Sequence, residues 1–535
     1  MILKGLQILS CGGMMKRQNN NKVTFKYYNM DQLKLPIELE VCIPDNHLAK
    51  IVNSAIEKMN IDPLIAKYKG GGTSAYHPKM MLKVLVYAYS QRVYSSRKIA
   101  KELRENIHFM WISGKNKPDF RTINIFRSSI MKDVVDEVFA SVIELLIQEG
   151  LVKLENYFLD GTKIEANANK YTFVWKKSTQ KFKTKLQDKI KHLISEIDRI
   201  NEEENKEYGN KDLEELGENG PVDSNKIDEL VRKLDEKLSN KPQKEHKAER
   251  KILKELKKDC LPRLKKYEQQ EEILQERNSY SKTDKDATFM RMKEDHMKNG
   301  QLKPGYNIQT GTEGQFIVNY SVHQKANDTN TLELHLEKFE KLHKKMPKKT
   351  IADAGYGSEE NYEILKSKEI DGYVKYNNFH YEQKESFKKQ IFRIENLGYD
   401  KKRDEYICPN EKRLKYRQTI KSKNKNGYES TIRIYECPDC LGCPKKAECT
   451  KAKGNREIQV NERLNELKAE MREKLLSKAG VEMRKKRCCE IESVFGQIKW
   501  NGQFKRFLLR GIEKVNTEWG LICMAHNMKK LALAK

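Results

Sequence analysis

The chain has 535 residues, and 104 Lys and Arg against 77 Asp and Glu give it a net charge of +27. At roughly 150 residues per domain this length predicts three or four domains, which excludes a disulfide-stapled mini-domain. No apolar run approaches the roughly 20 residues of a membrane span, and the first residues are too interrupted for a secretory signal. Such a basic chain is expected to work in the cytoplasm on a polyanion, by default nucleic acid. The alternative is a lysine-rich coding bias.

The positive charge is unevenly distributed. Residues 171–285 have a net charge of only +3, whereas residues 376–456 carry +9 and residues 481–535 carry +7. Neutralised phosphates release their counterions, so local positive charge favours polyanion binding. A nucleic acid is therefore expected at the two basic regions and not at the near-neutral middle.

Residues 47–150 are predicted to form an all-helical domain after a partly disordered leader, residues 1–46. Ser95 or Ser96 and Asp119 are placed to cap two short helices within it. Two short helices around a turn suit a helix-turn-helix-like DNA contact. The basic side chains expected to face phosphate are Arg97, Lys98, Arg121 and Arg127. The alternative is an ordinary helical bundle with a solvated basic face.

Residues 171–285 are predicted to form a coiled-coil insertion that protrudes as an antiparallel arm. Apolar residues at alternating four- and three-residue intervals form two seams. The seams consist of Leu186, Ile190, Leu193, Ile197 and Ile200, and of Ile227, Val231, Leu234 and Leu238. Pro262 is expected to kink or break a third helical stretch. The near-neutral charge favours protein packing over DNA binding.

Residues 151–170 and 286–375 are predicted to contain the strands of an α/β core. Asp160 and Asp353 each end an apolar run, and Glu492 lies in an amphipathic helix of the segment 457–535. Carboxylates at the ends of neighbouring strands converge at one sheet edge, and a helix packed across that edge can add a third. Such hard oxygen donors suit Mg²⁺ or Mn²⁺, and two such ions about 4 Å apart can cleave a phosphodiester. The alternative is a set of ordinary turn and surface carboxylates.

Four separated segments resemble the DDE transposases of bacterial insertion sequences, in the expected order, from about residue 60 to the C-terminus. They are "HPKMMLKVLVYAY" with "SSRKIAKEL", "FLDGTKIEANANK", "IADAGYGSEENYE" and "IESVFGQIKWNGQFKRFLLRG". The resemblance implies an RNase H-like mixed sheet flanked by helices, with Asp160, Asp353 and Glu492 as the catalytic, magnesium-binding carboxylates.

The same resemblance implies a function. A DNA transposase would cleave phosphodiester bonds at the element ends by two-metal-ion catalysis. It would then join the freed 3′-hydroxyl to target DNA, without a covalent enzyme–DNA intermediate. Its partners would be double-stranded DNA and a second copy of the chain on paired ends, in the nucleoid of a bacterial cytoplasm. One alternative is a catalytically inactive relative that acts as a sequence-specific DNA-binding repressor. Another is a zinc-dependent DNA-binding scaffold with structural carboxylates.

The family's helix signature reads Tyr, two residues, Arg, three residues, Glu, six residues, Lys, and this chain keeps it only in part. Glu492 and Lys499 keep the six-residue gap, but Cys488 stands at the Arg position and Arg487 lies one place off. Glu490 is a rival for the third carboxylate. Glu492 is preferred because it would share a helix face with Lys499.

Basic and aromatic residues follow Glu492 closely. Cations interleaved with aromatic rings suit a surface that grips phosphates, here Lys499, Lys505, Arg506 and Arg510. Trp500 or Phe504 is placed to stack on an unpaired base. The alternative, preferred for Phe507, is that the aromatic rings belong to the core.

The chain contains eleven cysteines, and this odd number in a chain without a secretory signal argues against a disulfide framework. The basic insertion of residues 376–456 contains a C-x₂-C-x₂-C-x₅-C pattern with one further cysteine upstream: Cys437, Cys440, Cys443 and Cys449, with Cys408. Four thiolates suit structural Zn²⁺. An iron–sulfur cluster and no metal at all are the alternatives.

Asp284 and Asp286 lie where the chain is expected to re-enter the core. They are either additional metal neighbours or members of a capped turn, and the turn is preferred.

Overall fold

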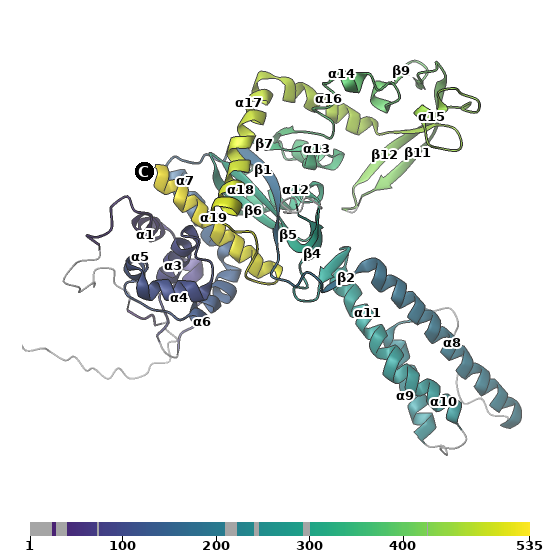
Figure 1. Ribbon diagram of the computed structural model, residues 1–535, viewed down its shortest axis with the longest axis horizontal. Helices are drawn as coiled ribbons and strands as arrows, with labels where there is room; N and C mark the ends of the chain where they lie inside the picture. The colour runs from purple at the N-terminus through teal and green to yellow at the C-terminus, as the bar shows by residue number, and fades with distance from the viewer. Residues whose placement is uncertain are drawn as a thin grey trace, which may run out of the picture. The chain divides into compact units, whose positions relative to one another are not determined.

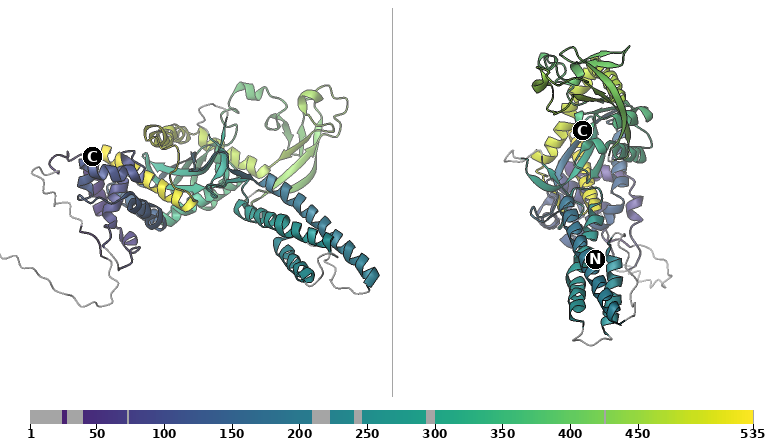
Figure 2. Two further views of the ribbon diagram at one scale, coloured as in Figure 1. Left: turned by 60° about the horizontal axis from the view of Figure 1, so that its bottom comes forward. Right: turned by 90° about the vertical axis from the view of Figure 1, so that its right-hand side faces the viewer.

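The computed structural model describes residues 24–27, 40–71, 74–208, 222–239, 246–292, 300–424 and 426–534. Most of the expected leader, residues 1–46, lies outside these ranges. The chain divides into two compact units, Met1–Leu145 with Asn527–Lys535, and Leu146–His526. Figures 1 and 2 show the elements of both. Within the described residues, no helix is long and apolar enough to cross a membrane.

The first unit is helical, as expected for the N-terminal region. Its helices are α1 (Leu48–Lys58), α2 (Asp62–Ile65), α3 (Pro78–Ser90), α4 (Ser96–Glu105), α5 (Ile107–Ile112), α6 (Phe120–Ile125), the π-helical η1 (Phe126–Ile130), the 3₁₀-helical η2 (Met131–Asp133) and the start of α7 (Val135–Gln148). Helix α3 is buried along nearly its whole length and forms the centre of this unit. Its apolar residues lie on all sides, which is typical of a central helix.

The capping predictions for α4 and α6 have different outcomes. The Asp119 carboxylate accepts a hydrogen bond from the Thr122 backbone N–H at 2.7 Å and caps α6, as predicted. Ser95 is the N-cap residue of α4, but its side chain makes no capping bond. Helix α5 intervenes between α4 and α6, so the unit differs from two helices joined by one turn.

A six-stranded mixed sheet lies at the centre of the second unit. Its strands are β1 (Asn156–Glu165), β4 (Thr288–Arg291), β5 (Leu302–Glu313), β6 (Phe316–His323), β7 (Lys349–Ala352) and β8 (Asp371–Val374). The order is β4-β5-β1-β7-β8, with β6 also paired to β5. Strands β1, β5 and β6 form an antiparallel meander, whereas β7 and β8 run parallel to β1. Helix α12 (Leu332–His343) packs on β6, and α13 (Glu359–Ser367) packs on β8.

Strand β1 extends beyond the residue at which it was expected to end. Asp160 lies in its middle, paired with Thr310 of β5, and the strand continues to Glu165. The long antiparallel partner β5 pairs with β1 as far as Glu165, whereas β7 pairs only with the first three residues of β1. The polar stretch after Asp160 therefore remains a strand because it has a partner on one side.

The predicted insertion forms a bundle of long helices, α8 (Lys176–Tyr208), α9 (Ser224–Ser239), α10 (Lys247–Glu255) and α11 (Leu261–Leu274), which Figure 1 shows side by side. Both predicted seams are packed in its core with residues of α10 and α11. The π-helical η3 (Leu256–Cys260) links α10 to α11 just before Pro262, which cannot donate a backbone hydrogen bond and crowds the preceding turn. The expected kink is thus a π turn. Coiled-coil geometry itself stays a prediction.

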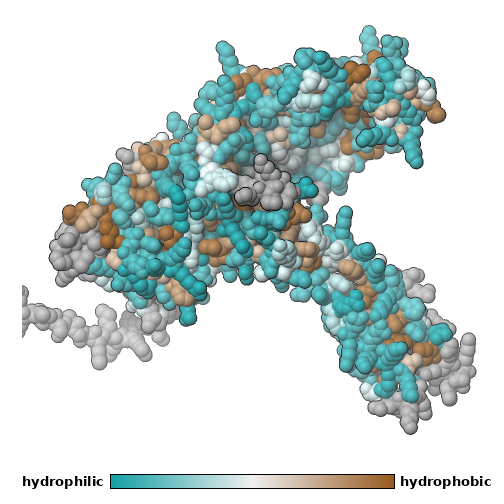
Figure 3. Space-filling model, in the orientation of Figure 1, coloured by the Kyte–Doolittle hydropathy of each residue, from teal (hydrophilic) through white to brown (hydrophobic). Residues whose placement is uncertain are grey.

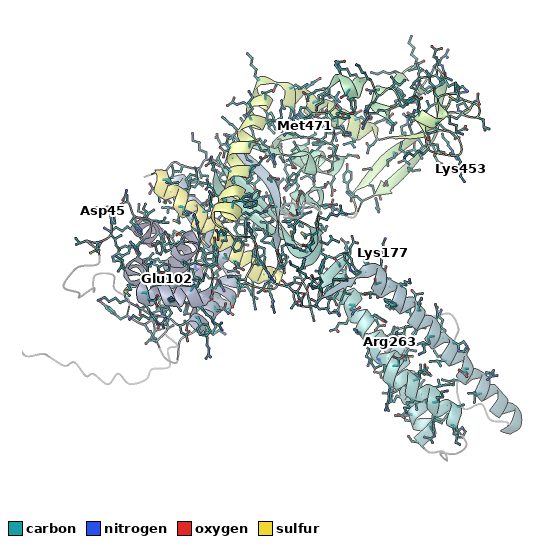
Figure 4. All side chains as sticks on the ribbon, in the orientation of Figure 1. Asp45, Glu102, Lys177, Arg263, Lys453 and Met471 are labelled. Carbon is teal, nitrogen blue, oxygen red and sulfur yellow. The ribbon has the colours of Figure 1, made fainter. Side chains whose placement is uncertain are left out.

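The face of this bundle that Figure 3 shows is mostly hydrophilic (teal), with a few hydrophobic patches. Figure 4 labels Lys177 near the start of α8 and Arg263 on α11. Arg263 pairs with Asp259, and Lys189 also reaches Asp259, so cations and carboxylates alternate on the surface. This mixed surface accounts for the low net charge of the region.

The basic Cys-containing region forms a separate antiparallel sheet. Its strands are β9 (Gly398–Asp400), β10 (Glu405–Ile407), β11 (Arg413–Lys423), β12 (Glu429–Glu436) and β13 (Glu457–Val460), in the order β13-β12-β11-β10-β9. A small core of Leu414, Tyr435, Ile458 and Val460 includes two of the cysteines. From here α16 (Glu462–Leu476) returns to the central sheet and packs on β8.

Candidate active site

The register of the central sheet brings the two predicted aspartates together. In the parallel pair β1 and β7, Phe158 lies opposite Ile351, so two further residues along each chain place Asp160 beside Asp353. Strand β7 ends at Ala352, and Asp353 caps the 3₁₀ helix η5 (Ala354–Tyr356) by accepting the Gly355 N–H at 2.8 Å. The two carboxylates thus lie at the edge where β7 stops and β1 continues.

Glu492 reaches the same edge from an irregular helix. The helical run consists of α17 (Lys478–Arg487), the π-helical η7 (Cys488–Glu492), α18 (Ser493–Gly496) and the π-helical η8 (Gln497–Asn501). Segment η7 contacts β1 and β5. Because a π turn contains one residue more than an α turn, Arg487 and Glu492 lie on the same face although they are five residues apart. The π turn therefore accommodates the one-residue displacement of Arg487 from the family signature.

The guanidinium of Arg487 lies between all three carboxylates. Its Nη2 is 3.0 Å from Asp160 Oδ2 and 3.8 Å from Asp353 Oδ2, and its Nη1 is 3.0 Å from Glu492 Oε1. Arg487 is only 6% exposed, and its Nε is buried without a hydrogen-bond partner. Three negative charges from separate elements thus converge on one buried cation.

The rival carboxylate Glu490 faces a different part of the fold. Its Oε2 accepts the backbone N–H of Gln315 at 2.7 Å, in the tight turn between β5 and β6. Gln315 has a positive φ of 63°, so this bond helps to hold a left-handed turn residue. The arrangement favours Glu492 as the third member of the set.

The three carboxylates have the donor chemistry for a divalent cation, but Arg487 lies at their centre. Among the described residues, no group of three or more His, Cys, Asp or Glu side chains is arranged to hold a metal ion as it stands. Hard oxygen donors from three elements fit Mg²⁺ or Mn²⁺ once the guanidinium moves aside. The residues that could hold the ion are Asp160, Asp353 and Glu492.

Two residues near this edge carry no signal in the sequence. Lys375 follows β8, and the pKa of its ammonium is lowered by burial and by the nearby Arg487 and Arg484. Asp328 lies between β6 and α12, where the segment "KANDTN" looks like an ordinary turn. Neither follows a periodic pattern, so only the fold reveals that they adjoin the site.

The residues after Glu492 divide into exposed and buried groups. Trp500 is 58% exposed, and the Lys505 ammonium lies 4.2 Å from the centre of its ring. Arg506 and Arg510 are exposed, and they donate to backbone carbonyls of the segment after β1. These residues, with Lys505 and Trp500, form an exposed basic and aromatic surface.

Other predictions in this segment are wrong. Lys499 is only 5% exposed, so it does not belong to the surface expected to grip phosphate. The expected face was that of a regular α-helix, and the π turns η7 and η8 change it. Phe504 is 2% exposed and packs on Phe507 and Trp519, so it cannot stack on a base. For both phenylalanines the core alternative is confirmed.

Of the N-terminal basic residues that were predicted to face phosphate, three are exposed and one is buried. Arg97, Lys98 and Arg121 are exposed, and Arg97 and Arg121 lie 5.2 Å and 5.7 Å from the Phe120 ring. Arg127 is 3% exposed and cannot face phosphate. Its guanidinium donates to polar groups inside the helical unit: the Tyr89 hydroxyl, the Tyr94 carbonyl, the Ser96 hydroxyl and the Asn124 side chain.

The five candidate zinc ligands lie around one small cavity, lined by Cys408, Cys437, Cys440, Cys443 and Cys449 together with Arg456. Arg456 donates to Cys449 Sγ at 3.0 Å. Burial and the neighbouring thiols Cys440 and Cys408 raise the pKa of Cys437 to about 11. The fold therefore gathers the predicted sulfur donors, from the end of β10 and from the turns after β12, although none of them is in a ready metal-binding arrangement.

Asp284 and Asp286 fix the start of the last helix, α19 (Ile512–Ala534). Asp284 accepts the N–H of Gly511 at 3.2 Å and the Tyr306 hydroxyl at 2.9 Å, and Asp286 accepts the N–H of Ile512 at 2.9 Å. These bonds support the capped-turn alternative, because the carboxylates satisfy backbone donors at a helix terminus.

Two transposase family models match separate parts of the chain. Residues 407–532 match a family model described as a transposase DDE domain, and residues 37–129 match one described as a transposase domain (DUF772). No curated protein and no solved structure matches the chain. The first match contains Glu492, and both aspartates lie outside the two matched segments. Together the two matches indicate that the chain is an insertion-sequence DDE transposase.

Proposed function

We propose that this chain cleaves DNA at the ends of its insertion sequence and transfers the freed 3′-hydroxyl to target DNA, with Asp160, Asp353 and Glu492 as its catalytic carboxylates. The observation that carries the proposal is their convergence on the single guanidinium of Arg487. The strand order β6-β5-β1-β7-β8, with an antiparallel meander and two parallel strands, supports an RNase H-like core.

The three carboxylates would hold Mg²⁺ or Mn²⁺. Bound divalent cations supply the charge neutralisation and Lewis acidity that phosphodiester cleavage needs. Asp160 and Asp353 are fixed by strand register and by the cap of η5, whereas Glu492 is more exposed, with a side chain about half accessible. Glu492 is therefore the ligand best able to adjust when Arg487 leaves the centre.

The exposed surface of Trp500, Lys505, Arg506 and Arg510 would bind the DNA beside these carboxylates. Phosphate contacts would position the strand, and the Trp500 ring would stack on an unpaired base near the cleaved end. Trp500→Ala is expected to weaken binding of end DNA about tenfold, by the loss of one stacked base, and Lys505→Ala by less. Salt titration of both variants separates stacking from charge.

An end-cleavage assay with Mg²⁺ tests the function. Asp160→Asn, Asp353→Asn and Glu492→Gln should each lower the rate at least about a thousandfold, because each removes a charged ligand. Glu490→Gln is the matched control on the same helix and should cleave at nearly the parental rate. Parental cleavage by Asp160→Asn would overturn the assignment. Binding of end DNA without any cleavage would instead identify an inactive, repressor-like relative.

We further propose a structural zinc ion at the cysteine cavity. The support is the placement of all five thiols around one cavity in a sheet with a very small apolar core. A domain of this size commonly depends on a metal for stability. Elemental analysis of the purified protein should find about one zinc per chain. The same measurement on Cys437→Ser should find that the zinc is lost. Iron in place of zinc, or no metal, would overturn the proposal.

A homodimer on paired ends is also proposed. Sedimentation of the full chain with and without end DNA tests it, and a monomer in both conditions would contradict it.

A further inference from the structure

Asp328 is held against β1 at the position next to Asp160. It begins the 3₁₀ helix η4 (Asp328–Asn330). Its Oδ1 accepts hydrogen bonds from the side-chain amides of Asn307 and Gln309, both at 2.8 Å. These two buried residues are two apart on β5 and share one face of the sheet. Gln309 lies opposite Gly161, the residue that follows Asp160.

Two glycines provide the space for this carboxylate. A Cβ at Gly161 would overlap both the Asp328 carboxylate and the Gln309 amide. A Cβ at Gly355 would lie 3.0 Å from Asp353 Oδ1 and 3.6 Å from Asp328 Oδ2. The carboxylates of Asp353 and Asp328 therefore border the same point in space, on either side of a residue that has no side chain.

The turn that contains Asp328 is tied to the loop that contains Asp353. The Thr329 hydroxyl donates to the Gly355 carbonyl at 2.7 Å, and the Asn361 side chain bridges the carbonyls of Thr329 and Tyr356. Burial, and then the negative charge of Asp328, raises the pKa of the Tyr356 hydroxyl, with smaller contributions from Asp160 and Asp353. The buried Tyr356 hydroxyl is thus close enough to all three aspartates for their negative charges to act on it.

The charge of Asp328 lacks the counter-ion that the other carboxylates share. Among the described ion pairs, Arg487 bridges Asp160, Asp353 and Glu492, and none includes Asp328. Successive residues of β1 point to opposite faces, so Asp328, packed against Gly161, acts from the face opposite to Asp160. The region therefore contains four carboxylates, three of them paired with Arg487, and they outnumber the two cations Arg487 and Lys375.

From this arrangement we infer that Asp328 is a fourth carboxylate of the candidate site, which raises its affinity for divalent cations. The inference rests on the proposed metal-dependent function. The cation already drawn among the other three carboxylates, Arg487, shows that the site attracts positive charge. A fixed carboxylate across β1 strengthens that attraction without having to move, because the two amides hold it by hydrogen bonds in the space that the two glycines leave.

Binding of Mn²⁺ to the full chain, followed by the paramagnetic resonance signal of the free ion, tests this role. Asp328→Asn keeps an acceptor oxygen for the two amides and removes only the charge. We expect its Mn²⁺ affinity to fall about tenfold, as for other residues that support a metal site. Its metal-free unfolding temperature should stay the same or rise, because a repulsive charge is removed. Glu333→Gln removes an exposed charge a few residues away in the first turn of α12 and should change the affinity less than about twofold.

The possible results separate this inference from the proposed function. Parental Mn²⁺ affinity in Asp328→Asn, together with weak binding in Asp160→Asn, would overturn the inference alone. A lower metal-free unfolding temperature with unchanged affinity would assign Asp328 a structural role and would also overturn it. Absence of Mn²⁺ binding by the parental chain would contradict the metal-dependent function, and the inference with it.

Discussion

Two regions of the second unit gather candidate metal ligands around a buried arginine, and they do so in different ways. The carboxylates of Asp160, Asp353 and Glu492 come from three elements far apart in the chain, whereas the five thiols all lie between residues 408 and 449. Arg487 and Arg456 are each 6% exposed. A site assembled from distant elements exists only after the central sheet has formed, whereas the cysteine cavity depends on one small sheet.

The two arginines also have different roles. Arg487 forms ion pairs with all three carboxylates and occupies the place that a metal cation would need. Arg456 donates to Cys449 Sγ and to the Phe392 carbonyl, and its backbone N–H points to Cys440 Sγ. Arg487 neutralises the charge of the carboxylates, whereas Arg456 links the turn that contains Cys449 to the Phe392 backbone by hydrogen bonds.

The largest expected effect comes from Arg487→Gln. Without its guanidinium three carboxylates face one another, so the core should lose about 3 kcal/mol of unfolding free energy in the absence of metal. Added Mn²⁺ should recover most of this loss, because the ion takes over the charge. Urea unfolding with and without Mn²⁺ measures both. Arg456→Gln is the matched control and should destabilise only the Cys-containing sheet. Parental metal-free stability in Arg487→Gln would show that Arg487 is not the counter-ion.

Removal of the proposed zinc ion should affect the two regions unequally. Because the Cys-containing sheet has only a small apolar core, a chelator is expected to open it to proteases while the central sheet stays resistant. Limited proteolysis with mass spectrometry should place the first cuts within residues 376–456. Earlier cuts in the central sheet would contradict the separation of the two regions.

Acid should destabilise the central sheet through two buried histidines. Burial lowers the pKa of His335 well below its usual value, and burial with Lys338 and Lys325 lowers that of His323 to about 4. Because the folded pKa values are depressed, the unfolded chain binds protons first. The unfolding free energy that depends on the neutral histidines is therefore fully present above about pH 6.5 and is lost as the pH falls toward about 4. His323 alone accounts for roughly 3 kcal/mol.

Urea unfolding between pH 7.5 and 5 measures this loss. His323→Asn keeps a polar partner for Ser321, with which His323 shares a hydrogen bond, and should flatten the dependence. A parental slope in His323→Asn would assign the acid sensitivity to other groups.

Local patterns predicted the elements of this fold better than their environments. The two seams of the helical bundle, the Asp119 cap and the meeting of Asp160 with Asp353 follow from periodicity, composition and the apolar runs before the two aspartates, although β1 continues past Asp160. The burial of a cation does not follow from such patterns, because it depends on distant partners. The Arg127 guanidinium is buried among acceptors that include the Tyr89 hydroxyl and the Tyr94 carbonyl. A π turn has no composition of its own, so neither the rotation that buries Lys499 nor the alignment of Arg487 with Glu492 was predictable.

The smallest expected effect concerns the contact between the two regions. Glu360 on α13 accepts from Asn424 at 2.7 Å and from Asn426 at 3.1 Å, at the tip of the hairpin of β11 and β12. It is 8% exposed and lies on the helix that follows the Asp353 loop. Glu360→Gln turns one acceptor into a donor that faces another donor, which should cost about 1 kcal/mol.

Hydrogen exchange should therefore become faster at the hairpin tip, with the cysteine cavity unchanged. The matched control is Glu363→Gln on the same helix, α13. It loses only a surface ion pair with Arg463 of α16 and should leave the tip unchanged. Faster exchange confined to the tip, with parental DNA cleavage, would show that the two ligand clusters are energetically independent. A fall in the cleavage rate of Glu360→Gln would show that the hairpin helps to hold the Asp353 loop, because α13 is the element that the tip and that loop share.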